Sequence, residues 1–167
     1  MDKNKSGFTL IELIVVIAVL LLSTGFSIAT FNTFNEEKKL EQEAKRLVST
    51  LQTARTKAAS GETDPAQQAC DILGGYQVSV SINPSQYILE RNCIQGSVGS
   101  FLTIQQSTFP ENIIVISPVI ILFKAPSSVA MTTPDIPIKI RHATINKCVD
   151  ITVSPQGSII QGDKYAC

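Results

Sequence analysis

Four cysteines and one histidine are the side chains of this 167-residue chain best suited to nucleophilic or metal chemistry. The cysteines form no CxxC pair and match no zinc-binding spacing: Cys70, Cys93, Cys148 and Cys167. His142 stands alone at the predicted end of a strand, where a histidine is usually a surface or hydrogen-bonded residue. No GxSxG motif occurs, and Gly74-Gly75 is too short for a phosphate-binding loop and favours a turn. We therefore expect no enzyme, no metal and no cofactor.

The cysteines are better placed for disulfides. All four follow the apolar N-terminal segment described below, and disulfides persist in an oxidising compartment. Three pairings are possible. Cys70 and Cys93 flank the first predicted hairpin, and Cys148 and Cys167 flank the last. We expect two local bridges, each stabilising the fold by roughly 3 kcal/mol; four buried free thiols are the alternative.

One acidic residue, Glu12, lies inside an otherwise uncharged apolar segment from Phe8 to Phe31. As a helix this segment would extend about 36 Å, enough to cross a bilayer core of roughly 30 Å. A carboxylate costs about 2.5–3.5 kcal/mol at the bilayer centre and less near its edge, so Glu12 is expected to have a partner. Lys3 and Lys5 favour a cytoplasmic N-terminus. The alternatives are a signal peptide with a small-residue site at Ser27-Ile28-Ala29, a plain membrane anchor and a buried core helix.

The junction Ser6-Gly7-Phe8-Thr9-Leu10-Ile11-Glu12-Leu13 resembles the leader cleavage site of type IV pilins and type II secretion pseudopilins. The resemblance implies that a membrane prepilin peptidase cuts between Gly7 and Phe8, and that the new amine of Phe8 is N-methylated. It also implies a partner for Glu12, which in this family neutralises the N-terminal amine of a neighbouring subunit. Such a pair is worth far more in the low-dielectric interior of a helix bundle than in water.

A second helical pattern follows the apolar segment. Apolar residues recur at spacings of three and four and indicate one buried face: Leu40, Ala44, Leu47, Val48, Leu51, Ala54 and Ala58. No proline occurs from Phe8 to Ala59, so we expect one continuous helix, apolar in its first half and amphipathic in its second. Gly25 costs about 1 kcal/mol relative to alanine and is a candidate bend. Gly61, Asp64 and Pro65 are expected to end the helix.

The rest of the chain has the pattern of about seven short strands. Tyr76 to Ile82 alternates between apolar and polar residues, and Gln86 to Asn92 returns after the Asn83-Pro84-Ser85 turn, which predicts a hairpin. Further segments are expected at 100–105, 113–116, 119–124, 136–140, 149–153 and 158–161. A long helix packed on an antiparallel β-sheet or β-sandwich is an α+β fold, and the type IV pilin fold is of this kind.

The strand half is also similar, more diffusely, to minor subunits of the same class, the pseudopilin GspH and the pilins FimT and FimU. Three runs carry the similarity: Phe109-Pro110-Glu111-Asn112, Ile120-Ile121-Leu122-Phe123 and Ile151-Thr152-Val153-Ser154-Pro155-Gln156-Gly157. The similarity implies an apolar strand containing Phe123 and a closing strand–turn–Gly hairpin in a β-sandwich. The first hairpin, with its flanking cysteines, and the loop from Ala125 to Pro134 depart from the pattern.

The composition is that of a folded, weakly charged protein. Apolar residues make up 44% of the chain and charged residues 17%, which excludes a disordered polymer. The formal net charge is zero, so general binding of nucleic acid is not expected. The expected segments are a leader at 1–7, a transmembrane and filament-core helix at 8–31, an amphipathic helix at 32–60 and an extracytoplasmic β-rich domain at 61–167.

These features predict a minor pilin or pseudopilin, a structural subunit stored in the inner (cytoplasmic) membrane with its N-terminus in the cytoplasm. The expected partners are other pilins or pseudopilins, prepilin peptidase and an inner-membrane assembly platform. The resulting filament is expected to be a type IV pilus or a type II secretion pseudopilus, in the periplasm or at the cell surface. The alternative is a secreted or signal-anchored β-sandwich binding module.

Overall fold

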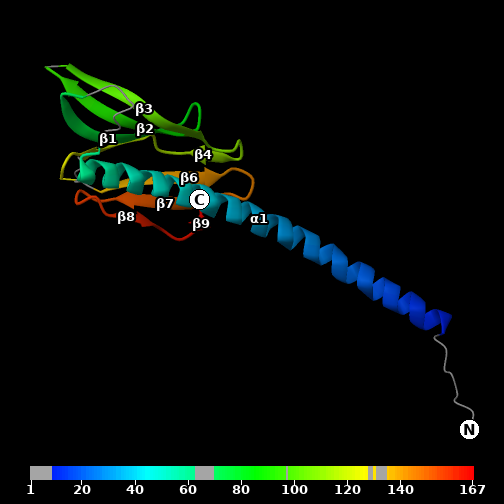
Figure 1. Ribbon diagram of the computed structural model, residues 1–167. Helices are drawn as coiled ribbons and strands as arrows, with labels where there is room; N and C mark the ends of the chain where they lie inside the picture. The colour runs from blue at the N-terminus through cyan, green and yellow to red at the C-terminus, as the bar shows by residue number, and fades with distance from the viewer. Residues whose placement is uncertain (1–8, 63–69, 97, 128–129, 131–134) are drawn as a thin grey trace, which may run out of the picture. The chain divides into compact units, whose positions relative to one another are not determined.

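The computed structural model describes residues 9–62, 70–96, 98–127, 130 and 135–167 (Figure 1), and the side chains of 23–30 lie outside that description. Within the described residues one helix precedes nine strands. The chain divides into two compact units, Met1–Glu36 and Glu37–Cys167. Helix α1, Leu10–Ser60, contributes to both units.

The C-terminal half of α1 buries the predicted apolar stripe. Six of its residues are fully buried and Val48 is partly buried; the six are Leu40, Ala44, Leu47, Leu51, Ala54 and Ala58. The helix ends at Ser60, and Gly61, one of the residues predicted to end it, follows with a left-handed φ of 63°, whereas Asp64 and Pro65 lie outside the described residues. The Gly61 N–H donates to the carbonyl of Ala58 and the Glu62 N–H to that of Lys57, both at 3.3 Å. This is the Schellman arrangement, which satisfies carbonyls that the end of a helix leaves open.

The first sheet is antiparallel and has the strand order β3-β2-β1-β5. Its strands are β1 Ile72–Ser81, β2 Gln86–Gln95, β3 Val98–Thr108 and β5 Val119–Lys124. The predicted first hairpin is confirmed as β1–β2, with Tyr76 opposite Arg91 and Val80 opposite Tyr87. Buried and partly exposed residues alternate along β2, because one face of the sheet lies against the core.

The second sheet has the order β4-β6-β7-β8, with β9 also paired to β7. Its strands are β4 Ile113–Val115, β6 Ile136–His142, β7 Lys147–Val153, β8 Ile159–Gln161 and β9 Tyr165–Ala166. Only residues 116–118 separate β4 from β5, yet these two strands belong to different sheets. The predicted closing hairpin is confirmed as β7–β8, where the Gly157 N–H donates to the carbonyl of Ser154 at 2.8 Å.

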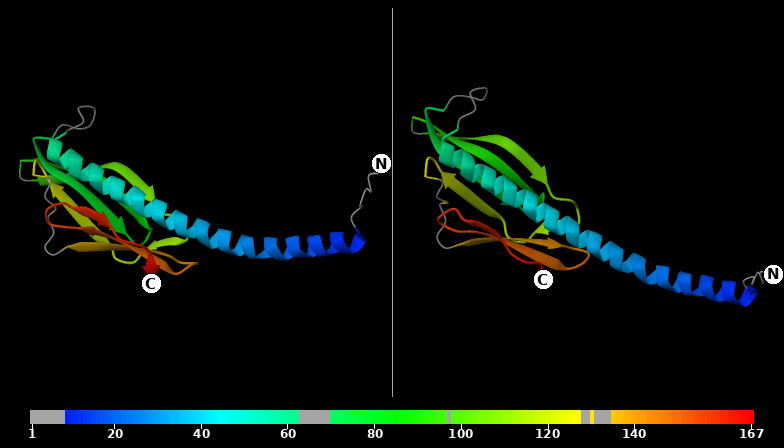
Figure 2. Two further views of the ribbon diagram at one scale, coloured as in Figure 1. Left: turned by 90° about the horizontal axis from the view of Figure 1, so that it is seen from below. Right: turned by 60° about the horizontal axis from the view of Figure 1, so that its bottom comes forward.

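One hydrophobic core joins both sheets to the C-terminal half of α1, which lies across them (Figures 1 and 2). The core takes Val78 from β1, Ile121 from β5, Ile138 from β6 and Ile151 from β7, all fully buried. Burial of these side chains is the main stabilising contribution. The predicted α+β class, a long helix packed on antiparallel sheets, is therefore confirmed, and it is consistent with a type IV pilin-like fold.

The expected turn at Gly74-Gly75 is wrong, because both glycines lie within β1. The register shifts between Leu73 and Gly75, which marks a bulge. Gly75 has φ 141°, and a Cβ there would stand 2.2 Å from the carbonyl oxygen of Phe123 on β5. Close approach of two backbones, rather than a turn, explains the glycine.

Candidate functional site

The start of α1 is organised by Thr9 and Glu12. The Glu12 backbone N–H donates to Thr9 Oγ1 at 3.3 Å, and the Leu13 N–H donates to the Thr9 carbonyl at 3.2 Å. Thr9 is therefore the N-cap and Glu12 the third helical residue, the spacing of a Thr-x-x-Glu capping box. A carboxylate in the first turn also favours the positive end of the helix dipole. This capping role of Glu12 was not predicted, although the Thr-x-x-Glu spacing in the sequence indicates it.

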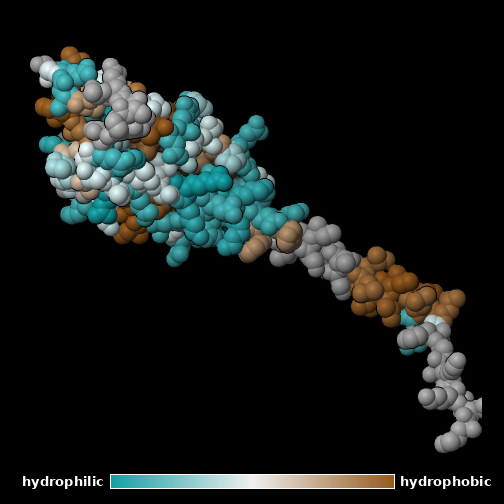
Figure 3. Space-filling view, viewed as in Figure 1, coloured by the Kyte–Doolittle hydropathy of each residue, from teal (hydrophilic) through white to brown (hydrophobic). Residues whose placement is uncertain are grey.

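The first turns of α1 expose apolar side chains on every face. From Leu10, 77% exposed, to Leu22, 69% exposed, the large apolar side chains all have at least 47% of their surface accessible. Figure 3 shows them as a brown stretch of α1. A helix that is apolar all round is normally buried in protein or lipid. This stretch is therefore a surface that requires a partner.

Several residues of the predicted N-terminal site fall outside the description. These are the leader 1–7 with Gly7, the predicted mature N-terminus Phe8, and the side chains of 23–30. Gly25 falls within the span of α1, and its role as a bend stays a prediction. Among the described residues, no helix has the length and apolarity needed to cross a membrane.

The structure brings the four cysteines together in the two expected pairs. Cys70 is bonded to Cys93, with their Cα atoms 5.2 Å apart, and Cys148 to Cys167 at 5.3 Å. The first bridge ties the segment before β1 to β2, and the second ties β7 to the C-terminus. The two bridges therefore hold the first and the last hairpin regions of the globular unit.

Removal of the Cys148–Cys167 bridge is expected to lower the free energy of unfolding by about 3 kcal/mol, because the bridge restricts the unfolded chain. The test is a Cys148→Ala/Cys167→Ala double variant, compared with the parent by urea unfolding in detergent. The Cys70→Ala/Cys93→Ala variant is the matched comparison, since the sequence separations are 19 and 23. If the Cys148→Ala/Cys167→Ala variant has the same urea unfolding curve as the parent, the bridge does not stabilise the fold.

An ionic cluster fastens the C-terminal segment to α1. Lys164 Nζ lies 3.1 Å from Glu37 and 3.9 Å from Glu41. Glu41 also pairs with Lys45 at 2.8 Å and Lys38 at 3.0 Å. Hydrogen bonds from Lys45 and then Lys38 lower the pKa of Glu41 to about 2. Glu41 thus stays ionised, and keeps these contacts, well into the acid range.

Two further residues able to do acid–base or anion-binding chemistry, His142 and Arg91, are both buried. His142 is fully buried at the end of β6, with its Nε2 2.9 Å from Nδ2 of Asn112. Arg91 is 1% exposed on β2, and its burial was missed, although alternation along that strand indicates an inward position. No group of three or more His, Cys, Asp or Glu side chains among the described residues could hold a metal ion.

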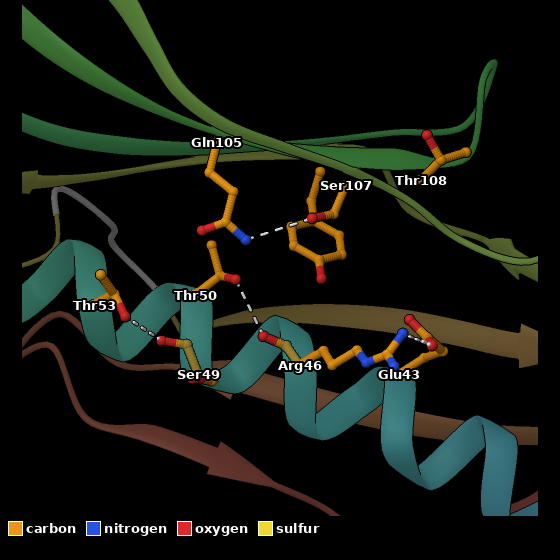
Figure 4. Close-up of a pocket in the computed structure, with 9 residues that line it drawn as sticks. Glu43, Arg46, Ser49, Thr50, Thr53, Gln105, Ser107 and Thr108 are labelled. Atoms are coloured by element: carbon orange, nitrogen blue, oxygen red, sulfur yellow. Dashed lines mark hydrogen bonds and ion pairs between the residues drawn. The ribbon is translucent and has the colours of Figure 1, made fainter.

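A polar groove of about 500 Å³ lies between α1 and the end of β3, and we name it the α1–β3 groove. It is lined by Glu43, Arg46, Ser49, Thr50, Thr53, Tyr87, Gln105, Ser107 and Thr108. Figure 4 shows Gln105 reaching from the sheet toward Thr50 on the helix. Arg46 binds Glu43 at 2.7 Å, and Gln105 donates to Ser107 at 3.4 Å. The groove therefore offers mainly neutral hydrogen-bonding groups.

Comparison with known proteins bears on the N-terminal segment alone. Residues 2–28 match the family model of the prokaryotic N-terminal methylation motif. No curated protein and no solved structure matches the chain. The motif is the signal of type IV pilins and pseudopilins, so the resemblance drawn from Gly7, Phe8 and Glu12 is confirmed at this level. It supports a precursor that prepilin peptidase processes and that assembles with other pilins.

Proposed function

We propose that this chain, which carries the prokaryotic N-terminal methylation motif, is the precursor of a minor pilin or pseudopilin. The single observation that carries the proposal is the exposed apolar stretch of α1 from Leu10 to Leu22, which lies within the residues that match the motif. Such a stretch is stable in lipid before assembly and in a bundle of similar helices after assembly. The precursor is stored in the inner membrane and then delivered by an assembly platform to the filament.

Glu12 selects the register of assembly in this proposal. Its side chain is exposed in the isolated chain, so it is accessible to a partner. After cleavage behind Gly7, the methylated amine of Phe8 supplies a positive charge that the mature N-terminus brings into the bundle. Pairing between this amine and Glu12 of a neighbour removes the cost of an isolated buried charge.

The globular unit Glu37–Cys167 forms the outer layer of the filament. Without Asp2, Lys3 and Lys5 the mature chain has 12 basic and 13 acidic residues, a formal charge of −1. A nearly neutral outer layer suits close packing among subunits better than general capture of nucleic acid. The minor-subunit part of the proposal rests on the sequence resemblance of the strand half to GspH, FimT and FimU alone, since no curated protein and no solved structure matches the chain.

The deciding experiment determines the mature N-terminus of the protein from its native host. Mass spectrometry is expected to find an N-methylated Phe8, because the peptidase cuts after Gly7. The precursor should accumulate when prepilin peptidase is deleted. A mature chain that begins at Thr30 would instead indicate an ordinary signal peptide and overturn the proposal.

A further inference from the structure

Strand β3 is a long edge strand of the first sheet. It pairs with β2 on one side and with no described strand on the other. Its 11 residues, Val98–Thr108, include no charged residue and no proline. Val98 is 70% exposed and Phe101 54% exposed. The unpaired N–H and C=O groups along such an edge favour pairing with another strand.

The other edges that the structure describes are short or bridged. Strand β5, at the opposite edge of the same sheet, is bridged through Phe123 to Ala130. In the second sheet β4 and β8 have three residues each. Short and covered edges are the usual protection against unwanted pairing. Among the described strands, β3 alone combines length, exposure and the absence of charge.

A bulge in β3 turns polar side chains toward α1. Thr103 pairs with Glu90 and Gln105 with Leu89, so Ile104 is the extra residue. Gln105 therefore projects to the same side as Leu89, which is buried against the core. Ser107, opposite the buried Tyr87, follows on this side. Gln105 and Ser107 therefore lie on the core-facing side of the sheet at its β3 edge, where they line the α1–β3 groove.

The groove has hydrogen-bonding capacity but little net charge. Tyr87, which is 3% exposed, lines the groove together with the hydroxyl and amide side chains of Thr50, Gln105 and Ser107. Glu43, 6% exposed, is neutralised by Arg46. Neutral polar side chains of this kind pair well with hydroxyl or amide partners, which add no buried charge to the groove.

We propose that β3 is a docking edge for an extended segment of a neighbouring filament subunit. The segment adds as a strand along residues 98–103 and continues past the bulge, where it directs hydroxyl or amide side chains into the α1–β3 groove, which Gln105, Ser107 and Thr108 line. Main-chain hydrogen bonds supply affinity and the groove supplies specificity. The proposal rests on the proposed function, because assembly through α1 holds the neighbouring subunit at high local concentration.

The test is site-specific photo-crosslinking of the full chain in cells that assemble filaments. A benzophenone-bearing phenylalanine replaces Phe101 on β3 or, as a control, Tyr165 on β9, which is 36% exposed. We expect an adduct between position 101 and an extended segment of another subunit, and no such adduct from position 165. Peptide mass mapping identifies the partner segment.

Two lysine substitutions separate edge pairing from general surface effects. Thr103→Lys places a charge on the exposed edge, and should reduce the adduct from position 101 at least about tenfold. Ile160→Lys changes a 62% exposed residue on β8 and should leave the adduct unchanged. Circular dichroism of the purified variants checks that both fold.

The outcomes distinguish this proposal from the proposed function. If the chain is present in sheared filaments but position 101 gives no adduct, the docking edge alone is overturned. The same holds if position 101 gives an adduct that Thr103→Lys does not reduce. An adduct with a protein outside the filament would overturn the choice of partner. Absence of the parent chain from the filament fraction would overturn the proposed function, and the docking edge with it.

Discussion

Replacement of Glu12 by glutamine is expected to reduce incorporation into filaments at least about tenfold while leaving the amount of membrane-held protein unchanged. Glutamine has no charge to pair with the N-terminal amine of the neighbouring subunit. In a low-dielectric helix bundle that ion pair contributes well over the roughly 1.4 kcal/mol that corresponds to a tenfold change. Insertion into the membrane does not need the carboxylate and should become slightly easier. Immunoblots of sheared filaments and of membranes measure the two pools.

The capping geometry supplies the control for this experiment. Glutamine at position 12 keeps the capping box of Thr9, in which either Glu or Gln at the third position serves. Thr9→Ala removes the cap at a cost of about 1 kcal/mol but keeps the charge of Glu12. If capping, through the contact at 3.3 Å, were the main role of Glu12, Thr9→Ala would impair assembly and Glu12→Gln, which keeps the cap, would not. Normal incorporation of Glu12→Gln would overturn the assembly role altogether.

Replacement of Gly75 by alanine is expected to destabilise the globular unit by about 3 kcal/mol or more, because backbone strain and a steric clash add. The new Cβ would meet the Phe123 carbonyl at 2.2 Å, and φ at this position is 141°. The β1–β5 pairing must shift to relieve the contact, because the atom in the way belongs to the backbone. Urea unfolding followed by circular dichroism measures the change.

Gly96→Ala is the matched control for the effect of φ alone. Gly96 also has a positive φ, 61°, but nothing lies within 4 Å of a Cβ built there. It should cost about 1–2 kcal/mol, the ordinary penalty of a left-handed alanine. Equal losses in the two variants would contradict the close approach of β1 to β5.

Local patterns in the sequence determined the helix, its buried stripe, the β1–β2 and β7–β8 hairpins and the N-terminal motif. Each depends on residues near in sequence: the 3.6-residue period that places Leu40, Ala44 and Leu47 on one face, or the Gly61 cap. The methylation motif is likewise a short contiguous signal, which a peptidase reads from the chain itself.

Only the tertiary structure decided which segments lie side by side. No local pattern separates β4 from β5 into different sheets, and β9, only two residues long, was not predicted. The role of Gly75 depends on Phe123, 48 positions later, and the α1–β3 groove depends on a bulge that turns Gln105 toward the helix. The physical reason is that helix period and turn chemistry act over a few residues, whereas strand pairing is settled by the burial of one core shared by the whole unit.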